Sequence, residues 1–193
     1  MLLVVLALVA ASAAASPPVL PIAFNTTFSM TLPGASLKHD HPAFWSYDAS
    51  QGGQLVWHPS CPLGGSTGCA IVFTGGYSNP AIFVVSSEQF QSQPQSCCLL
   101  AAGVPILPPT SFSKYAPVIN TTILHTNRNV SLNVQMFFSQ NRQCFVDAAG
   151  NLARVLDVDV VWDLPVMAQW SVGPQPALLF AAPALCASAP SCG

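Results

Sequence analysis

Residues 24–32 read FNTTFSMTL, and this stretch decides the fold. Its even positions carry two Phe, one Met, one Leu and one Thr, whereas its odd positions carry only Asn, Thr and Ser. A period of two gives an extended strand one apolar and one polar face. Residues 129–138 repeat the alternation, and one apolar side is expected to hold Val130, Leu132, Val134, Met136 and Phe138. The chain is therefore predicted to form antiparallel strands that bury one face.

Turn residues between apolar runs predict three hairpins. The first spans residues 45–57 around DASQGG, the second spans residues 70–86 around GGYSNP, and the third follows residue 144 around AAGN. Gly and Asn supply the positive φ angles that tight hairpin turns need. In the third hairpin, residues 151–163 are expected to form one continuous strand.

The fold class follows from the number and spacing of these strands. The arms at residues 70–73 and 81–85 are apolar on both faces, which predicts strands that are covered on both sides at the centre of the sheet. Strands about ten residues apart with turns between them predict a mostly β fold with little helix, either an antiparallel sandwich or an open half-barrel of curved sheets. The proline-rich residues 105–117 are expected to be an ordered surface loop rather than a linker.

The first residues are typical of an export signal. An uncharged apolar run from Leu2 to Ala11 is followed by small residues, with Ala13 and Ala15 at the −3 and −1 positions of a cleavage site. We therefore expect residues 1–15 to be a signal peptide and residues 16–193 to form a single extracellular β domain. No later segment has the roughly 20 uninterrupted apolar residues that a membrane helix needs.

Composition narrows the classes of function. Of the 193 residues, 51% are hydrophobic and 6% are charged, and the formal net charge is −2. Such a chain has no basic surface that could neutralise a nucleic-acid backbone, so nucleic-acid binding is excluded. The ratio of apolar to charged residues exceeds what a tightly filled core of this size needs, which favours a lined cavity or an exposed apolar face.

Seven cysteines in an exported chain predict three disulfides and one thiol that is free or bonded to a second chain. Cys61 and Cys69 bracket a glycine-rich loop and are the best candidates for a local bridge. Cys97 and Cys98 are expected to reach different partners, because consecutive strand residues point to opposite faces. The sequence leaves the remaining pairing open among Cys144, Cys186 and Cys192.

Three Asn-x-Ser/Thr sequons, at Asn25, Asn120 and Asn129, are predicted sites of N-glycosylation. Asn25 and Asn129 fall on the polar sides of their predicted strands, which agrees with an outward position. We therefore expect a secreted glycoprotein.

Two clusters of side chains could hold a metal ion. Asp157 and Asp159, with Asp163, share one face of the predicted strand at residues 151–163, and carboxylates are ligands that Ca²⁺ prefers. The alternative is an ordinary solvated strand face. The segment His39-Asp40-His41 could also clamp a metal with help from His58 or Asp48, although a solvated loop after a Pro-Gly turn explains it as well. We expect no other cofactor.

Gly64-Gly65-Ser66-Thr67-Gly68 matches the Gly-x-Ser-x-Gly spelling of a hydrolase nucleophile elbow. The elbow needs a strand before the serine and a helix after it, whereas here Cys61-Pro62 precedes it and a strand follows. A triad of Ser66, Glu88 and His125 is the less favoured alternative to a glycine-rich disulfide loop.

Several motifs together resemble the ependymin-related secreted proteins, within the broader set of LolA-like half-barrels. Ser46-Tyr47-Asp48-Ala49 is similar to an aromatic-Asp hairpin, and residues 76–85 followed by Cys97-Cys98-Leu99-Leu100 resemble a strand that leads to a cysteine. The most specific match is Phe180-Ala181-Ala182-Pro183-Ala184-Leu185-Cys186, which resembles a Phe-x-x-Pro-x-x-Cys ending. The arginine-rich return strand of that family is replaced here by residues 54–58.

The resemblance implies curved antiparallel sheets that enclose an apolar pocket, Ca²⁺ association, dimers, an extracellular role and no catalytic residues. It also implies that one of Cys97 and Cys98 bridges to Cys186. The early cysteine of the family is absent, so the partner of Cys144 stays open. The predicted function is therefore a secreted, non-enzymatic protein that binds an apolar small molecule or lipid. The alternative is a structural or adhesive protein that assembles through its glycosylated face and its odd cysteine.

Overall fold

The computed structural model describes residues 17–31, 42–61, 67–114, 116–125, 131–139, 142–157, 160–165 and 169–193. The predicted signal peptide lies outside these ranges. None of the helices within them has the length and apolar content that crossing a bilayer requires.

The described chain is mostly β-strand, with short 3-10 turns as its helical elements. The strands of the first half are β1 (Ala23–Thr31), β2 (Pro42–Asp48), β3 (Gly53–His58), β4 (Gly68–Thr74), β5 (Ala81–Ser87) and β6 (Ser96–Ala102). Those of the second half are β7 (Ala116–His125), β8 (Ser131–Ser139), β9 (Arg142–Asp147), β10 (Leu152–Asp157), β11 (Val160–Asp163) and β12 (Ser171–Val172). The 3-10 segments are η1 (Ser111–Lys114), η3 (Ala177–Phe180) and η4 (Ala184–Ser188).

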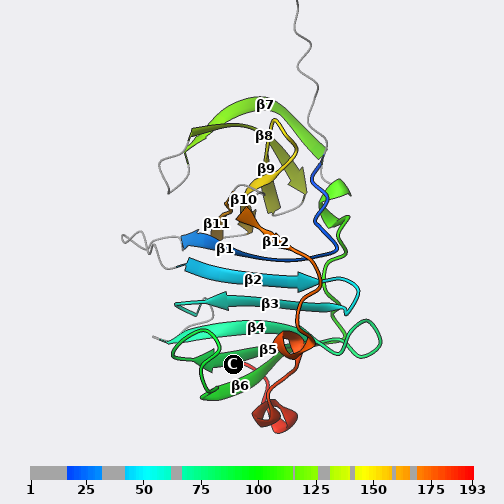
Figure 1. Cartoon of the computed structure of the whole chain (residues 1–193), viewed down its shortest axis with the longest axis vertical. Helices are drawn as coiled ribbons and strands as arrows, with labels where there is room; N and C mark the ends of the chain where they lie inside the picture. The colour runs from blue at the N-terminus through cyan, green and yellow to red at the C-terminus, as the bar shows by residue number, and fades with distance from the viewer. Residues whose placement is uncertain are drawn as a thin grey trace, which may run out of the picture.

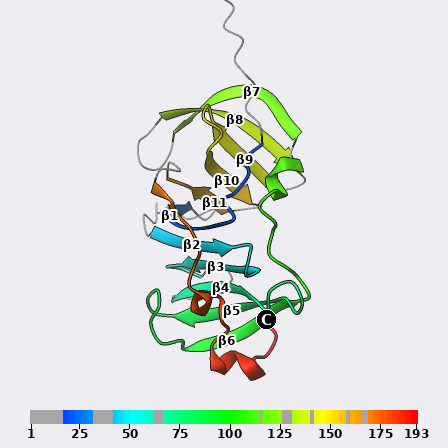
Figure 2. The same cartoon turned by 45° about the vertical axis from the view of Figure 1, so that its right-hand side comes forward.

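All of these strands belong to one antiparallel sheet in the order β6-β5-β4-β3-β2-β1-β11-β10-β9-β8-β7, and β12 pairs with the start of β1. Two meanders, β1 to β6 and β7 to β11, join where β1 pairs with β11, and the sheet stays open at β6 and β7 (Figures 1 and 2). The predicted mostly-β antiparallel fold with little helix is confirmed, in its open form.

Local turn chemistry located the hairpins correctly. The β2–β3, β4–β5 and β9–β10 hairpins all form where the turn residues predicted them. In the β9–β10 turn, Gly150 adopts a φ of 85°, a left-handed conformation that favours glycine. The continuous strand expected at residues 151–163 was wrong: β10 ends at Asp157, and β11 runs back beside it with Val160 opposite Asp157.

Two expectations about faces and positions were only partly right. Leu132, Val134 and Met136 pack on one face of β8, as predicted. In β8, Phe138 is exposed and Phe137 is fully buried in the main core, whereas Val134 packs on the other face against Phe145 and Ala153. Both faces of β8 therefore bury apolar side chains, which alternation cannot reveal. The arms β4 and β5 are covered on both sides as predicted, but they lie next to the sheet edge at β6 and not at its centre.

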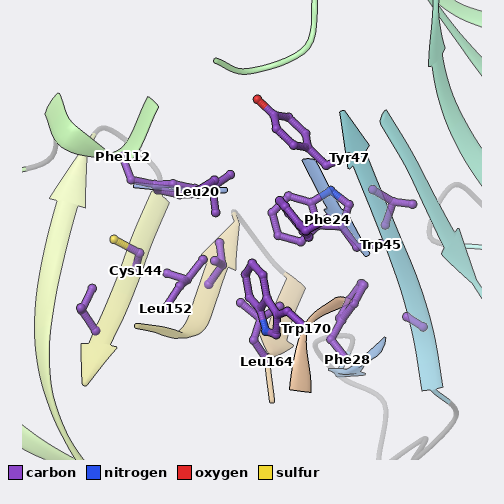
Figure 3. Close-up of a cluster of buried hydrophobic side chains, with 14 of the residues drawn as sticks. Leu20, Phe24, Phe28, Trp45, Tyr47, Phe112, Cys144, Leu152, Leu164 and Trp170 are labelled. Carbon is purple, nitrogen blue, oxygen red and sulfur yellow. The ribbon is translucent and has the colours of Figure 1, made fainter. Parts of the chain in front are cut away.

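The main core joins the two meanders. Residues from β1 and β2 pack in one cluster with Phe137 of β8 and Cys144 of β9, so the two halves of the sheet face each other across it. Figure 3 shows aromatic rings at its heart. The Phe24 ring lies 4.9 Å from Trp45, 5.3 Å from Tyr47 and 4.7 Å from Trp170 between centroids. Such pairs add to the stability that burial of the rings already provides.

The C-terminal residues 173–193, called the tail below, cover the face of β3 to β6 that points away from the main core. Phe180 of η3 packs with Leu55, Val72 and Val85 in a second buried cluster. A Cβ at Gly53 would lie 2.3 Å from the Phe180 ring, so glycine is needed there for the tail to approach the sheet. In Figures 1 and 2 the tail runs from β12 down past β6.

Three disulfides join Cys61 to Cys69, Cys97 to Cys186 and Cys98 to Cys192. The first is the expected local bridge, and the other two confirm that the adjacent cysteines have different partners. The tail thereby passes around the edge strand β6: the Leu99 N–H donates to Pro190 O at 2.8 Å, and the Cys192 N–H donates to Leu99 O at 2.9 Å. The bridges fit a protein of an oxidising compartment.

Candidate functional site

A cavity of about 420 Å³ lies on the inner face of the sheet. Its walls come from β2 to β5 on one side, from β9 to β11 on the other, and from the β6–β7 connection. The lining residues are Leu20, Trp45, Tyr47, Gln54, Val56, His58, Ile71, Phe73, Ile82, Leu100, Val104, Pro105, Leu107, Phe112, Arg142, Val155 and Trp162. Most of these side chains are apolar, and the volume falls in the range of about 300–1,000 Å³ typical of small-molecule sites.

Residues 103–114 close one side of the cavity and are called the strap below. The sequence correctly predicted an ordered segment here, but the strap is more than a surface loop, because Ile106 and Phe112 are buried in the main core. The Tyr47 hydroxyl, which points away from the core in Figure 3, donates to Leu107 O at 2.8 Å. The Leu20 N–H donates to Pro109 O at 3.1 Å. These bonds hold the strap over the inner face.

Three exposed apolar side chains border the cavity. Leu100 is 42% exposed, Val104 is 44% exposed and Leu107 is 42% exposed, and all three line the cavity. Leu100 belongs to the edge strand β6, and the other two belong to the strap. The side of the cavity at these residues is therefore its apolar mouth.

Few polar groups line the cavity. Gln54, Val56 and His58 share the inner face of β3, because alternate strand residues point the same way. Tyr47 stands directly opposite Gln54 in the β2–β3 ladder. Burial raises the pKa of Tyr47, and the charges of Tyr77 and Asp48 raise it further. The phenol therefore stays protonated and keeps its bond to the strap.

His58 is 3% exposed, and its Nδ1 lies 3.0 Å from the Met30 sulfur. Burial lowers its pKa to about 4, so the ring is neutral at physiological pH. The sequence proposed His58 or Asp48 as a third metal ligand beside the imidazoles of the His39-Asp40-His41 segment, but that segment lies outside the described ranges. In the structure His58 is a neutral wall residue of the cavity.

Acidification from pH 7.5 to pH 5 is expected to cost about 2 kcal/mol of stability through His58. The folded pKa of about 4 lies below the unfolded value of about 6.5, so the unfolded state binds more protons in this window. Stability should therefore fall as the pH drops, and His58→Leu should remove this part of the slope. Urea unfolding of both proteins at the two pH values measures it; equal slopes would contradict the assignment.

Asp48 connects the β2–β3 turn to the tail. The carboxylate is fully buried and accepts hydrogen bonds from Ser50 N at 3.0 Å, Ser50 Oγ at 2.5 Å, Gln51 Nε2 at 2.8 Å and Gln175 N at 3.1 Å. Burial alone would raise the pKa of Asp48, but the bonds from Ser50, Gln175 and Gln51 outweigh it and hold the pKa below its usual value. The ionised Asp48 is therefore a structural anchor and is already saturated with donors.

Of the three acidic residues predicted to bind calcium, Asp163 alone has a described side chain. Asp163 lies on β11 and forms an ion pair with Arg154 of β10. Asp159 and the side chain of Asp157 lie outside the description. Among the described side chains, no group of three or more metal-ligating residues comes together.

Of the other predicted site residues, most lie outside the described part of the chain. Ser66, Asn129 and the side chains of Asn120 and His125 fall outside the description. Asn25 is half-buried, and its Nδ2, the atom to which a glycan would attach, donates to Gln175 Oε1 at 2.8 Å.

All seven cysteines lie in the described ranges, and Cys144 is the one without a disulfide. It is fully buried in the main core, and burial raises the pKa of its thiol to about 12. A bridge from Cys144 to a second chain, the mode of assembly considered from the sequence, is incompatible with this position.

No protein-family model matches the chain. No curated protein matches it significantly either. The function must therefore be argued from the cavity itself.

The cavity residues were missed at the level of sequence because their roles depend on distant segments. From the sequence alone, Gln54 is only part of a return strand, and the strap is only a loop. One signal could have found them: Gln54 and His58 interrupt an otherwise apolar strand at alternate positions, which places two polar groups on a buried face.

Proposed function

We propose that the protein is a secreted, non-enzymatic glycoprotein that binds an apolar, lipid-like molecule in the cavity between the sheet and the strap. The cavity carries the proposal: it is large enough for a small-molecule ligand, and its walls are mostly apolar. A void of this size lined by apolar groups costs stability when nothing fills it, because the lining atoms lose dispersion contacts. A bound apolar molecule would restore those contacts.

The exposed apolar mouth supports the same function. Leu100, Val104 and Leu107 remain partly in contact with water at the border of the cavity. An apolar ligand that enters here would slide along apolar side chains from solvent to interior. Single exposed apolar residues are common on protein surfaces, but a cluster of them often marks an interaction site.

Export and family membership belong to the proposal. The signal-like residues 1–15, the sequons and the three disulfides support secretion and glycosylation. We further propose kinship with the ependymin-related proteins, which the open antiparallel sheet, the apolar cavity and the Cys97–Cys186 bridge support. Calcium association through Asp157 and Asp159, and dimer formation, rest on that resemblance alone.

Filling the cavity is expected to abolish ligand binding. Ile71 lines the cavity and is only half-buried, so Ile71→Trp should occupy the space with modest strain. Binding of the apolar dye Nile red, followed by its emission, should weaken at least about ten-fold, which corresponds to about 1.4 kcal/mol. Organic extracts of the protein purified from a secreting host should contain lipid that the variant lacks.

Val172→Trp is the matched control, because Val172 is 63% exposed and is not among the cavity residues. It should bind the dye as the parent protein does. The proposal fails if the parent protein carries no apolar molecule and binds no dye, or if both tryptophan variants bind equally well.

A further inference from the structure

Gln54 is a buried amide that lines the cavity without a partner. It is 8% exposed, and its side chain forms no hydrogen bond within the described part of the chain. A primary amide offers two donors and two acceptor sites. Leaving such a group unpaired in a buried place costs about 1–3 kcal/mol, so buried amides normally have a partner. The amide atoms of Gln54 are not sealed from solvent, as the unpaired indole N–H groups of Trp45 and Trp162 are, so their partner comes from whatever occupies the cavity.

The surroundings of Gln54 determine which head group fits. Its ladder neighbours are Tyr47 on β2 and Phe73 on β4, which are both cavity residues. Asp48, which follows Tyr47, turns to the opposite face of β2, where its carboxylate accepts hydrogen bonds from Ser50, Gln51 and Gln175. Gln54 therefore lies between two aromatic neighbours that carry no charge.

Arg142 is the only Lys or Arg among the described residues that line the cavity, and the strand register places it away from Gln54. Tyr47, the neighbour of Gln54, pairs with Phe24 near the start of β1, whereas Trp162 pairs with Met30 near its end. The six steps from Phe24 to Met30 span about 20 Å along β1. Arg142 pairs with Asp157, and Asp157 pairs with Val160. Val160 lies two residues farther from the Gln54 end of the cavity than Trp162 does. The Gln54 end is therefore polar but has no cation to balance an anionic head.

We propose that Gln54 recognises an uncharged, hydrogen-bonding head group of the apolar ligand, such as an alcohol or a primary amide, in preference to a carboxylate. The inference rests on the proposed function and deepens it. A hydroxyl or amide head both donates and accepts, so it can satisfy both the Oε1 and the Nε2 of Gln54. A carboxylate only accepts; it leaves Oε1 unpaired and brings a charge into a mostly apolar site.

The test compares ligands that share a chain and differ in the head. Dodecanol, dodecanamide, dodecanoate and dodecane are titrated against the full chain loaded with Nile red at pH 8, where dodecanoate is ionised. The alcohol and the amide should displace the dye at concentrations at least about ten-fold lower than dodecanoate. In Gln54→Leu this advantage should disappear, while dodecane should bind as well as before or more tightly.

Gln143→Leu is the matched control, because Gln143 is a half-buried strand glutamine that is not among the cavity residues. It should keep the head-group preference. The inference is overturned if dodecanoate competes as well as the alcohol, if Gln54→Leu weakens all four ligands equally, or if the preference survives in Gln54→Leu, which would leave only water on the amide. Failure of Nile red and dodecane to bind the parent protein would instead overturn the proposed function.

Discussion

Loss of both disulfides that hold the tail is expected to destabilise the protein by about 7 kcal/mol, whereas loss of either one alone should cost only about 2.5 kcal/mol. The Cys97–Cys186 and Cys98–Cys192 bridges close almost the same long loop, with sequence separations of 89 and 94. While one bridge remains, the long loop stays closed, and only the short loop between the two bridges opens. Its closure entropy corresponds to about 2.5 kcal/mol, against about 4.5 kcal/mol for the long loop.

Paired alanine variants test this coupling. Cys97→Ala with Cys186→Ala removes one bridge, Cys98→Ala with Cys192→Ala removes the other, and the four changes together remove both. Denaturant unfolding should show a combined loss of stability well above the sum of the two single-bridge losses. Packing adds to the same trend, because Phe180 and Cys186 are buried against the sheet only while the tail is held there.

The local bridge gives a control of similar size. Cys61 and Cys69 are only 8 residues apart, so their removal should also cost about 2.5 kcal/mol and should add independently to either tail variant. Additive losses for the two tail bridges would mean that the tail is fixed to the sheet by packing alone. The expected coupling would then be wrong.

The hairpins could be predicted because turn residues are local signals in the sequence. The features that could not be predicted depend on contacts between distant segments. Gly150 and Asn151 predict a turn at residues 148–151, and the structure has the hairpin there. In contrast, nothing near β4 and β5 says that the tail covers one of their faces and that the cavity lies on the other. Apolar residues on both faces correctly predict burial on two sides. The covering segments, however, lie up to about a hundred residues away in the chain, so the predicted central position of β4 and β5 in the sheet is wrong.

The candidate site was less predictable than the fold for the same reason. An apolar cavity followed from composition and from the family resemblance, but its residues did not. Gln54 became notable only when its burial and lack of a partner were known, and Tyr47 only when its hydroxyl was found to bond to Leu107, 60 residues away. Hydrogen bonds between side chains and distant backbone have no period or spacing in the sequence, whereas strands and turns do.

The Asp48 anchor is expected to be worth about 3 kcal/mol, so Asp48→Asn should destabilise the protein by that amount. Because the change creates an Asn-Ala-Ser sequon at position 48, the parent and the variant are both produced in a host that does not N-glycosylate but allows disulfides to form, such as the bacterial periplasm. The asparagine removes the charge that the donors of Ser50, Gln51 and Gln175 stabilise, and it turns one acceptor into a donor that faces other donors. Hydrogen bonds to a buried charge are stronger than those between neutral groups. The tail should loosen as well, because the Gln175 N–H loses its acceptor.

Asp147→Asn is the matched control. Asp147 occupies the equivalent turn between β9 and β10, where it accepts bonds from Ala149 N at 2.9 Å and Asn151 N at 2.8 Å. Asp147 is only half-buried and none of the described bonds joins it to the tail, so this change should cost about 1 kcal/mol. Similar losses in the two variants would show that Asp48 is an ordinary turn residue.

The pH dependence separates the Asp48 contribution from that of His58. The pKa of Asp48 is lower in the folded state than in the unfolded state, so its contribution is present above about pH 4, the unfolded value, and is lost as the pH falls through the folded pKa. The His58 contribution is lost at higher pH, between about 6.5 and 4. Unfolding of Asp48→Asn should therefore show a flatter stability profile than the parent below pH 4 and the same slope between pH 7.5 and pH 5. If the variant and the parent keep parallel profiles below pH 4, then Asp48 does not carry the charge that its hydrogen bonds imply.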